Sequence, residues 1–462
     1  MTIPLLGSDI NHPSIRDFSY GTVTINNNDE ENGSADERGS SSNGRPTTIQ
    51  ETIQELSFYL GPGFLISVAY MDPGNWATNI SGGATYSTAL LWVIVLASLM
   101  AMGIQVVAAK LGIATGRDVA QLCRESLPRH VVYILWIAAE LAMIATDMAE
   151  IIGAALGFQL MCNYPLWVGA LMAGTLSFAL LGVRSAFTSG YRVIEFVIMA
   201  LVAIISLVFV IELFIAKPSI PMVVEGLIPT IPDTQALYIA IGILGATVMP
   251  HSVYLHPDIV QDRRKLLIHK HGHDHGEHVH RLHLQFETAD TVLALTGAMF
   301  VNGAMLVVAA AALTGTGIDT LEDAYVTVEG VFGKHASILF GIALIAAGLS
   351  SSLVATMAGQ TVMDGFLNWS VNVWIRRSVT LVPSLIIVMI GLDPTKVLLA
   401  SQVALSFELP FVLIPLLYFT CQRDLMGGFV NHPITTALMG TIVGIIIVLN
   451  AWLLVALAQG KG

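Results

Sequence analysis

Charged residues are scarce in this sequence. Of its 462 residues only 12% are charged, whereas 54% are hydrophobic and the mean hydropathy is +0.72. An average soluble domain carries about 25% charged residues, so a soluble fold of this length would lack polar surface. Cysteine is equally sparse, and Cys123, Cys162 and Cys421 show no CxxC spacing. This pattern excludes a disulfide framework and a cysteine-based zinc or redox site.

Motifs of several other protein classes are missing as well. No basic segment is interleaved with aromatic residues, and the formal net charge is −12, so a nucleic-acid partner has no support. The phosphate-binding pattern GxxxxGKS/T does not occur, so any transport must draw on an ion gradient rather than on ATP. The metalloenzyme pattern HExxH does not occur either.

The polar residues that are present gather at the N-terminus. Residues 1–50 are rich in Asn, Ser, Asp and Glu, and we expect them to form a disordered cytoplasmic tail. Residues 51–460 form the predicted transmembrane domain, because a helix needs about 20 mostly apolar residues to cross a bilayer. Eleven spans are predicted, at 55–80, 86–111, 130–158, 163–183, 192–216, 234–262, 284–314, 324–362, 374–392, 394–420 and 433–458. The eighth span, 324–362, is too long for one crossing and is expected to extend out of the bilayer.

Lysine and arginine fix the predicted orientation in the cell membrane. With the N-terminus in the cytoplasm, 17 of the 21 Lys and Arg residues fall on the cytoplasmic side. Only Lys217, Lys334, Lys396 and Lys461 fall outside. Short loops rich in positive charge are retained in the cytoplasm, so the N-terminus is predicted inside and the C-terminus outside.

Two of the spans carry a proline and a glycine near their middle. Pro73 and Gly74 follow Asp72 in the first span, and Pro250 follows Met249 in the sixth. Proline removes a backbone donor and glycine has no preference for the helix, so both helices should break. Five spans begin at each break, which predicts an inverted repeat of 55–216 and 234–420 followed by an extra helix at 433–458. The alternative is a pair of proline kinks repaired by neighbouring helices.

The two breaks together predict a cation site. Asp72 is an ionisable side chain inside the membrane, and Asn75 offers an amide oxygen one turn later. The second break adds the Met249 thioether and a carbonyl near Ala246, and another carbonyl is expected near Ala69. One soft sulfur among oxygen ligands favours transition-metal ions over calcium or magnesium. The alternative for Met249 is simple core packing.

Three acids in the third span predict a route for protons. Glu140, Asp147 and Glu150 lie within roughly 80° of one another on a helix. Arg376 and Arg377 begin the ninth span on the same side, where they can pair with these acids. Carboxylates inside transporters commonly relay protons, and the alternative is a set of ion pairs that only hold helices together.

Histidines crowd the segment between the sixth and seventh spans. Residues 266–283 are predicted to form a cytoplasmic loop, and short His-rich tracts bind metals. The alternative is a solvated low-complexity loop with incidental affinity. The accessory metal-binding candidates are His269, His271, His273, His275, His278, His280 and His283.

The motifs at the breaks resemble the NRAMP family of proton-coupled divalent metal transporters. The likeness rests on Asp72-Pro-Gly-Asn75 and Ala246-Thr-Val-Met-Pro-His251, and it extends from about Leu60 to Leu457. It also includes Ala109-Lys-Leu-Gly-Ile-Ala-Thr-Gly116, Ala347-Gly-Leu-Ser-Ser-Ser352 and Ser401-Gln-Val-Ala-Leu-Ser-Phe407, and it is closest to the bacterial manganese-importing branch. The resemblance implies an all-α, leucine-transporter-like fold. It also implies a protein that imports Mn²⁺ or Fe²⁺ together with protons, and Cd²⁺ is expected to enter too.

The same resemblance implies roles for individual residues. Asp72, Asn75, Met249 and the Ala246 carbonyl would ligate the metal, and Gln402 would join them when the outer gate closes. Asp147, Glu150 and Arg376 would move protons, with Asp72 and His251 near the start of the route and Glu140 near its exit. No resident cofactor and no obligate protein partner are expected. The alternatives are a sodium-coupled amino-acid carrier, a membrane metalloenzyme and a passive channel.

Two positions depart from the family pattern. Ser252 stands where many members have Asn, and it is not expected to touch the ion. Glu408 places an acid in the tenth span where members usually have a small apolar residue. We expect Glu408 to face water near the cytoplasmic end, and the alternative is a buried acid that alters proton coupling.

Overall fold

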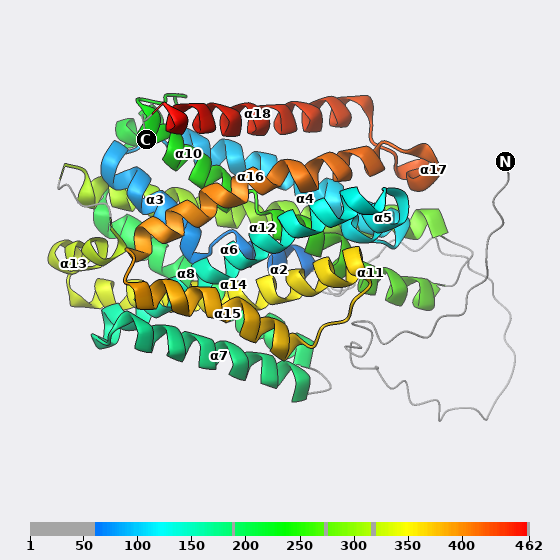
Figure 1. The fold of residues 1–462 in the computed structure, drawn as a ribbon. Coiled ribbons are helices and arrows are strands. Elements are labelled where there is room, and N and C mark those ends of the chain that lie inside the picture. The colour runs from blue at the N-terminus through cyan, green and yellow to red at the C-terminus, as the bar shows by residue number, and fades with distance from the viewer. Residues whose placement is uncertain (1–60, 187–189, 272–275, 316–319, 460–462) are drawn as a thin grey trace, which may run out of the picture.

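The chain folds into a bundle of helices. The structure is a computed structural model that describes residues 61–186, 190–271, 276–315 and 320–459. Within these ranges every regular element is a helix, so the predicted all-α class is confirmed. The long helices run side by side, with α13 at one end of the bundle and α5 and α17 at the other (Figure 1). The predicted tail, residues 1–50, lies outside the described residues.

The first half of the bundle begins with a helix in two pieces. α2 (Pro62–Ala69) and α3 (Pro73–Tyr86) are separated by a short non-helical segment. The helices that follow are α4 (Leu91–Thr115), α5 (Val119–Ser126), α6 (Arg129–Cys162), α7 (Leu166–Ala186), α8 (Gly190–Ala216) and the short α9 (Ile220–Glu225).

The second half opens in the same way. α10 (Thr234–Thr247) and α11 (Pro250–His271) are again two pieces of one path through the bundle. The later helices are α12 (Gly276–Leu313), α13 (Leu321–Phe332), α14 (Lys334–Leu367), α15 (Val373–Ile390), α16 (Pro394–Thr420), α17 (Arg423–Met426), a 3-10 turn at Gly427–Phe429 and α18 (Pro433–Ala458). Both predicted helix breaks are therefore present.

The described residues contain nine helices that are long and apolar enough to cross a membrane. The two pieces of the first path are each too short to meet this criterion alone, and α7 is apolar only over Leu166–Gly182. All these helices lie where spans were predicted, but the number of crossings remains a prediction.

Two predicted boundaries are wrong. The span predicted at 324–362 is not one long helix, because α13 ends at Phe332 and α14 starts after Gly333, whose φ of 89° lies in the left-handed region. The segment 266–283 is not simply a loop, because α11 continues to His271 and α12 begins at Gly276. Polar residues extend a helix beyond the bilayer as readily as apolar ones, and the Glu277–Arg281 ion pair supports the start of α12.

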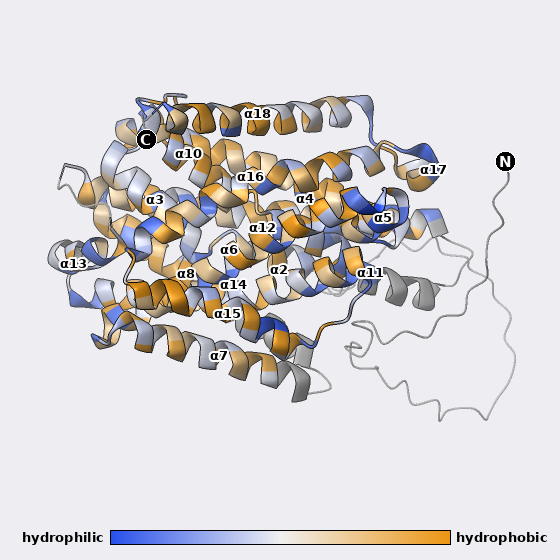
Figure 2. Ribbon diagram, viewed as in Figure 1, coloured by the Kyte–Doolittle hydropathy of each residue, from blue (hydrophilic) through white to orange (hydrophobic). Residues whose placement is uncertain are grey.

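Burial separates a central group of helices from a peripheral one. In the most apolar 18 residues of Thr234–Gln261, which spans α10 and α11, 94% of the residues are buried, whereas the fractions are 22% in Met199–Ala216 of α8 and 28% in α15. Figure 2 shows apolar residues along much of α7, α15 and α18, where many large apolar side chains are exposed, while polar residues gather at the two ends of the bundle. Apolar side chains exposed over so wide an area need a lipid environment, so the chain is an integral membrane protein.

Candidate metal-binding site

The first break is built by Asp72, Pro73 and Asn75. Asp72 caps α3, and its Oδ1 accepts hydrogen bonds from the Asn75 backbone N–H at 2.8 Å and from the Asn75 side-chain amide at 2.7 Å. Ala69 is the last residue of α2. The residue four positions later, which would donate to the Ala69 carbonyl in a continuous helix, is Pro73, and proline has no N–H. The break therefore leaves a carbonyl without its helical donor.

The second break repeats this arrangement. Pro250 lies four residues after Ala246, so the Ala246 carbonyl also lacks its helical donor. The Asn75 side-chain amide donates to this carbonyl at 3.0 Å. Asn75 thus links the two breaks directly, although 171 residues separate it from Ala246.

Several polar atoms at this junction have no hydrogen-bond partner within the described residues. They are the second carboxylate oxygen of Asp72, the Asn75 amide oxygen and the Gln402 amide oxygen, and all three side chains are fully buried. Buried polar atoms are almost always paired, so unpaired oxygens that gather in one place indicate a missing partner. A cation would satisfy them, and Met249, fully buried at the second break, adds a thioether sulfur.

Two glycines bring α16 against both breaks. A Cβ atom on Gly74 would collide with the side chain of Gln402, and a Cβ atom on Gly245 would collide with the Gln402 backbone carbonyl. Glycine is thus required at position 245, where the neighbour is backbone, whereas at position 74 the flexible Gln402 side chain would have to move aside. The structure therefore places Gln402 against Gly74 and Gly245, next to Asn75 and Ala246, and Ala69 and Met249 lie at the same two breaks as Asp72. That these residues bind a metal ion together remains a prediction.

The predicted proton-route residues lie on α6 and α15. Arg377 donates to Asp147 at 2.8 Å and also to Ser352. Arg376 makes two hydrogen bonds to Glu140, at 3.1 and 3.0 Å. Both arginines therefore pair with acids of α6, and the one that faces Asp147 is Arg377 rather than Arg376.

Two further residues of the predicted proton route, Glu150 and His251, are fully buried. The Glu150 carboxyl is fully buried and has no hydrogen-bond partner among the described residues. His251, also fully buried beside the second break, has neither ring nitrogen bonded there. The part of these residues in moving protons remains a prediction.

Sequence reasoning missed a polar network between α4, α11 and α12. Gln105 donates to the Tyr70 hydroxyl at 2.9 Å and bonds His256 at 2.9 Å, and His256 bonds Glu287 at 3.0 Å. Asp290, one turn beyond Glu287, accepts the backbone N–H of Gly63 at 2.8 Å and so holds the start of α2. The signal in the sequence was a set of isolated polar residues inside apolar spans.

The expectations for the histidine tract and for Glu408 are not confirmed. His273 and His275 lie outside the described residues, and the side chains of His269, His271 and His278 are not described. Among the side chains that are described, no group of three or more His, Cys, Asp or Glu could hold a metal ion, so the accessory site remains untested. The expectation that Glu408 faces water is wrong, because its side chain is only 5% exposed.

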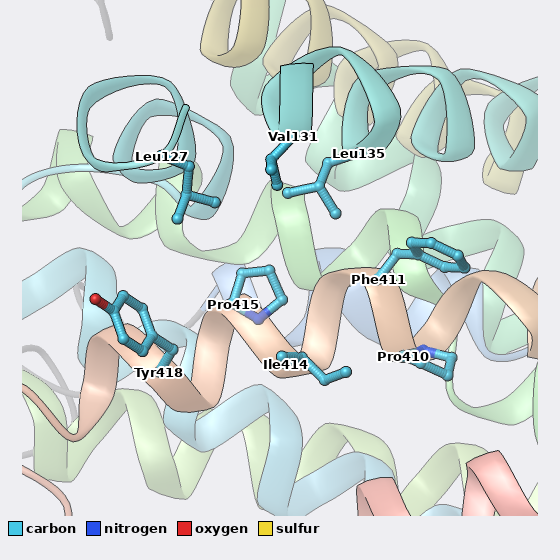
Figure 3. A pocket seen from close by; sticks show the side chains of 8 residues that line it. All are labelled: Leu127, Val131, Leu135, Pro410, Phe411, Ile414, Pro415 and Tyr418. Carbon is cyan, nitrogen blue, oxygen red and sulfur yellow. The ribbon is translucent and has the colours of Figure 1, made fainter. Parts of the chain in front are cut away.

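A distinct cavity of about 420 Å³ lies away from the breaks. Figure 3 shows the side chain of Leu127, which directly follows α5, and those of Val131 and Leu135 at the start of α6 facing the side chains of α16 across it. Its lining is apolar throughout, which does not suit a cation. The lining residues are Leu127, Val131, Leu135, Pro410, Phe411, Ile414, Pro415 and Tyr418.

The fold and the site together define a class of protein. Two helices broken at matching places inside an apolar bundle, with unpaired oxygens and a sulfur at their junction, define a membrane transporter with a small internal site. The site residues are fully buried, so the structure represents a closed conformation.

The chain belongs to the Nramp family. Residues 63–456 match the family described as natural resistance-associated macrophage protein-like. The chain is 43% identical over 402 residues to the divalent metal cation transporter MntH of Aeromonas hydrophila, covering 86% of this chain and 95% of that protein. It is 42% identical over 419 residues to MntH of Deinococcus radiodurans, covering 90% and 94%. The chain is therefore a transporter and not an enzyme.

Solved structures agree with this assignment. The manganese transporter of Eremococcus coleocola superposes with a TM-score of 0.76 at 32% identity, covering 90% of this chain and 89% of that one. The nucleobase-cation-symport transporter Mhp1 superposes with a TM-score of 0.51 at 14% identity, covering 87% and 91%. The second likeness shows the fold alone, which is the predicted leucine-transporter-like architecture.

Proposed function

We propose that this chain imports divalent transition-metal ions, Mn²⁺ or Fe²⁺, in symport with protons. The observation that carries the proposal is the junction at Asn75, which holds the Asp72 carboxylate and the Ala246 carbonyl together. Unpaired oxygens of Asp72, Asn75 and Gln402 surround this junction, and the Met249 sulfur lies at the same break. The names of the MntH relatives and of the Eremococcus manganese transporter support the same class of cargo.

The donor set favours a metal ion over an amino acid. An amino-acid carrier needs donors for a carboxylate and space for a side chain, whereas this junction offers acceptor oxygens and one sulfur in a fully buried position. A sulfur among oxygen ligands favours Mn²⁺, Fe²⁺ and Cd²⁺ over Ca²⁺ and Mg²⁺.

Coupling to protons is supported by the buried acids of α6. The Glu150 carboxyl lies unpaired within one helical turn of Asp147, which is held by Arg377. A buried carboxyl without a partner is stable only as the neutral acid, so it can accept a proton and pass it on when its surroundings change. Metal and protons would move inward across the cell membrane, with the N-terminus in the cytoplasm.

Uptake into sealed proteoliposomes tests this function. We expect Mn²⁺, Fe²⁺ and Cd²⁺ to enter, faster when the lumen is alkaline relative to the outside, and the lumen to acidify as metal enters. Ca²⁺ and Mg²⁺ should enter much more slowly. Metal entry without any proton movement would contradict symport, and sodium-driven uptake of an amino acid without metal uptake would contradict the cargo.

A further inference from the structure

Glu408 is a buried acid that the proposed proton route does not use. It lies on α16 six residues after Gln402, which places it about 9 Å farther along the helix axis. Its side chain is 5% exposed, and its Oε1 accepts one hydrogen bond, from the Tyr254 hydroxyl at 3.4 Å. Its Oε2 has no partner within the described residues, and no ion pair is recorded there for either oxygen.

This environment differs from that of the acids on α6. Glu140 and Asp147 each face an arginine, which compensates a negative charge. Glu408 has only one long hydrogen bond from a neutral hydroxyl, so the ionised form is strongly disfavoured in the closed conformation. We infer that Glu408 carries a proton whenever its surroundings are closed to water.

Polar groups lead from the second break past Glu408 toward the end of the bundle that holds α5. On α11, His251, Tyr254 and Asp258 are spaced by three and four residues and therefore share one face of the helix. Asp258 accepts a hydrogen bond from Thr361 of α14 at 2.9 Å. Three titratable groups lie close enough to Tyr254 to interact with it electrostatically. They are Glu408, Cys123 of α5 and Asp118, which caps the N-terminus of α5.

The helix that carries Glu408 contains a weak point next to it. Pro410 cannot donate to the carbonyl of Ser406, and the Asn450 side chain of α18 donates to that carbonyl instead, at 2.7 Å. Proline positions inside helices are common sites of bending. Bending of α16 at Pro410 would shift Glu408 relative to Tyr254 and would let water reach the Glu408 carboxyl.

We propose that Glu408 is a second protonation site of the transport cycle, on the inner half of the metal route. Glu408 is protonated and neutral while the inner side is closed. When the inner side opens, the carboxyl meets water, releases its proton to the cytoplasm and becomes a carboxylate, and closure requires that a proton is taken up again. Acid cytoplasm therefore holds the inner side closed, and this inference rests on the proposed function.

Infrared spectroscopy tests the protonation state without any transport. The metal-free wild-type protein should show the C=O stretch of a protonated carboxylic acid that is lost in Glu408→Gln. Glu212→Gln is the matched control, because Glu212 is a buried acid on α8 whose two oxygens also lack partners in the described residues. That variant should lose a different band and keep the Glu408 band. If Glu408→Gln removes no such band, the proposal is wrong even if metal transport is found.

Exchange of radioactive Mn²⁺ tests the consequence. At fixed outer pH and zero membrane potential, lowering the inner pH from 7.5 to 5.5 should slow exchange at least about threefold more in the wild type than in Glu408→Gln, because a single titrating group changes occupancy up to tenfold per pH unit. Tyr254→Phe keeps the carboxyl and should keep a dependence on inner pH, and Glu212→Gln should behave as the wild type. Equal dependence on inner pH in the wild type and Glu408→Gln would overturn the proposal.

Discussion

The two ion pairs between α6 and α15 allow a quantitative test, because they differ in burial. Arg377 and Asp147 are 1% and 6% exposed, whereas Arg376 and Glu140 are 7% and 19% exposed. Asp147→Asn leaves the Arg377 charge buried without a counter-charge, and breaking such a pair costs about 3–5 kcal/mol. Glu140→Gln acts where water has access and an amide can keep one hydrogen bond, so we expect a cost of about 1–2 kcal/mol.

The difference between the two variants is therefore at least about 1–2 kcal/mol, or roughly one factor of ten in the unfolding equilibrium. Unfolding in lipid bicelles, followed for both variants under the same conditions, measures it. Adding Arg377→Gln to Asp147→Asn should restore part of the loss, because the unpaired charge is gone. An Asp147→Asn protein no less stable than Glu140→Gln, or a double variant as unstable as the sum of its single changes, would show that Arg377 does not depend on Asp147.

Four further changes probe the metal site and the proton route. Asp72→Ala should weaken Mn²⁺ binding in calorimetry by at least about 100-fold, and unchanged affinity would remove this residue from the ligands. Met249→Ala should keep Mn²⁺ uptake but newly admit Ca²⁺ or Mg²⁺, and an unaltered ion profile in liposomes would refute the role of the sulfur. Glu150→Gln should let metal enter without acidifying the lumen, and normal acidification would mean that protons take another path. Gly245→Ala should destabilise the fold by about 1–3 kcal/mol because its Cβ meets the Gln402 carbonyl, whereas Gly440→Ala, with open space around its Cα, should not; equal melting temperatures would contradict this packing.

The sequence was most informative where proline coincides with other polar or small residues. Pro73 and Pro250 each remove one N–H and so favour a break, although proline alone does not force one, because Pro410 lies inside the continuous helix α16. Both breaks were predicted, and Asp72 and Ala246 lie at them, whereas their part in binding a metal ion remains a prediction. Charge and spacing were also sufficient to predict that Arg376 and Arg377 meet acids of α6.

Features that depend on contact between distant helices were not accessible from the sequence. Which arginine faces Asp147 is set by the rotation of α15 against α6, and hydropathy does not determine that rotation. Glu408 was expected in water because an isolated acid usually is, yet the packing of α11 against α16 buries it beside Tyr254. The network of Gln105, His256 and Glu287 likewise exists only because three helices meet.

Asn450 connects the last helix, α18, to α16. Its side-chain N–H donates to the Ser406 carbonyl in place of the N–H that Pro410 lacks, and its side-chain oxygen accepts a hydrogen bond from the Ser406 hydroxyl at 2.9 Å. A chain that ended before α18 would expose an unsatisfied carbonyl to hydrocarbon at the point where α16 is weakest. A protein without α18 would thus lose the hydrogen bonds from Asn450 that limit how far α16 can bend at Pro410.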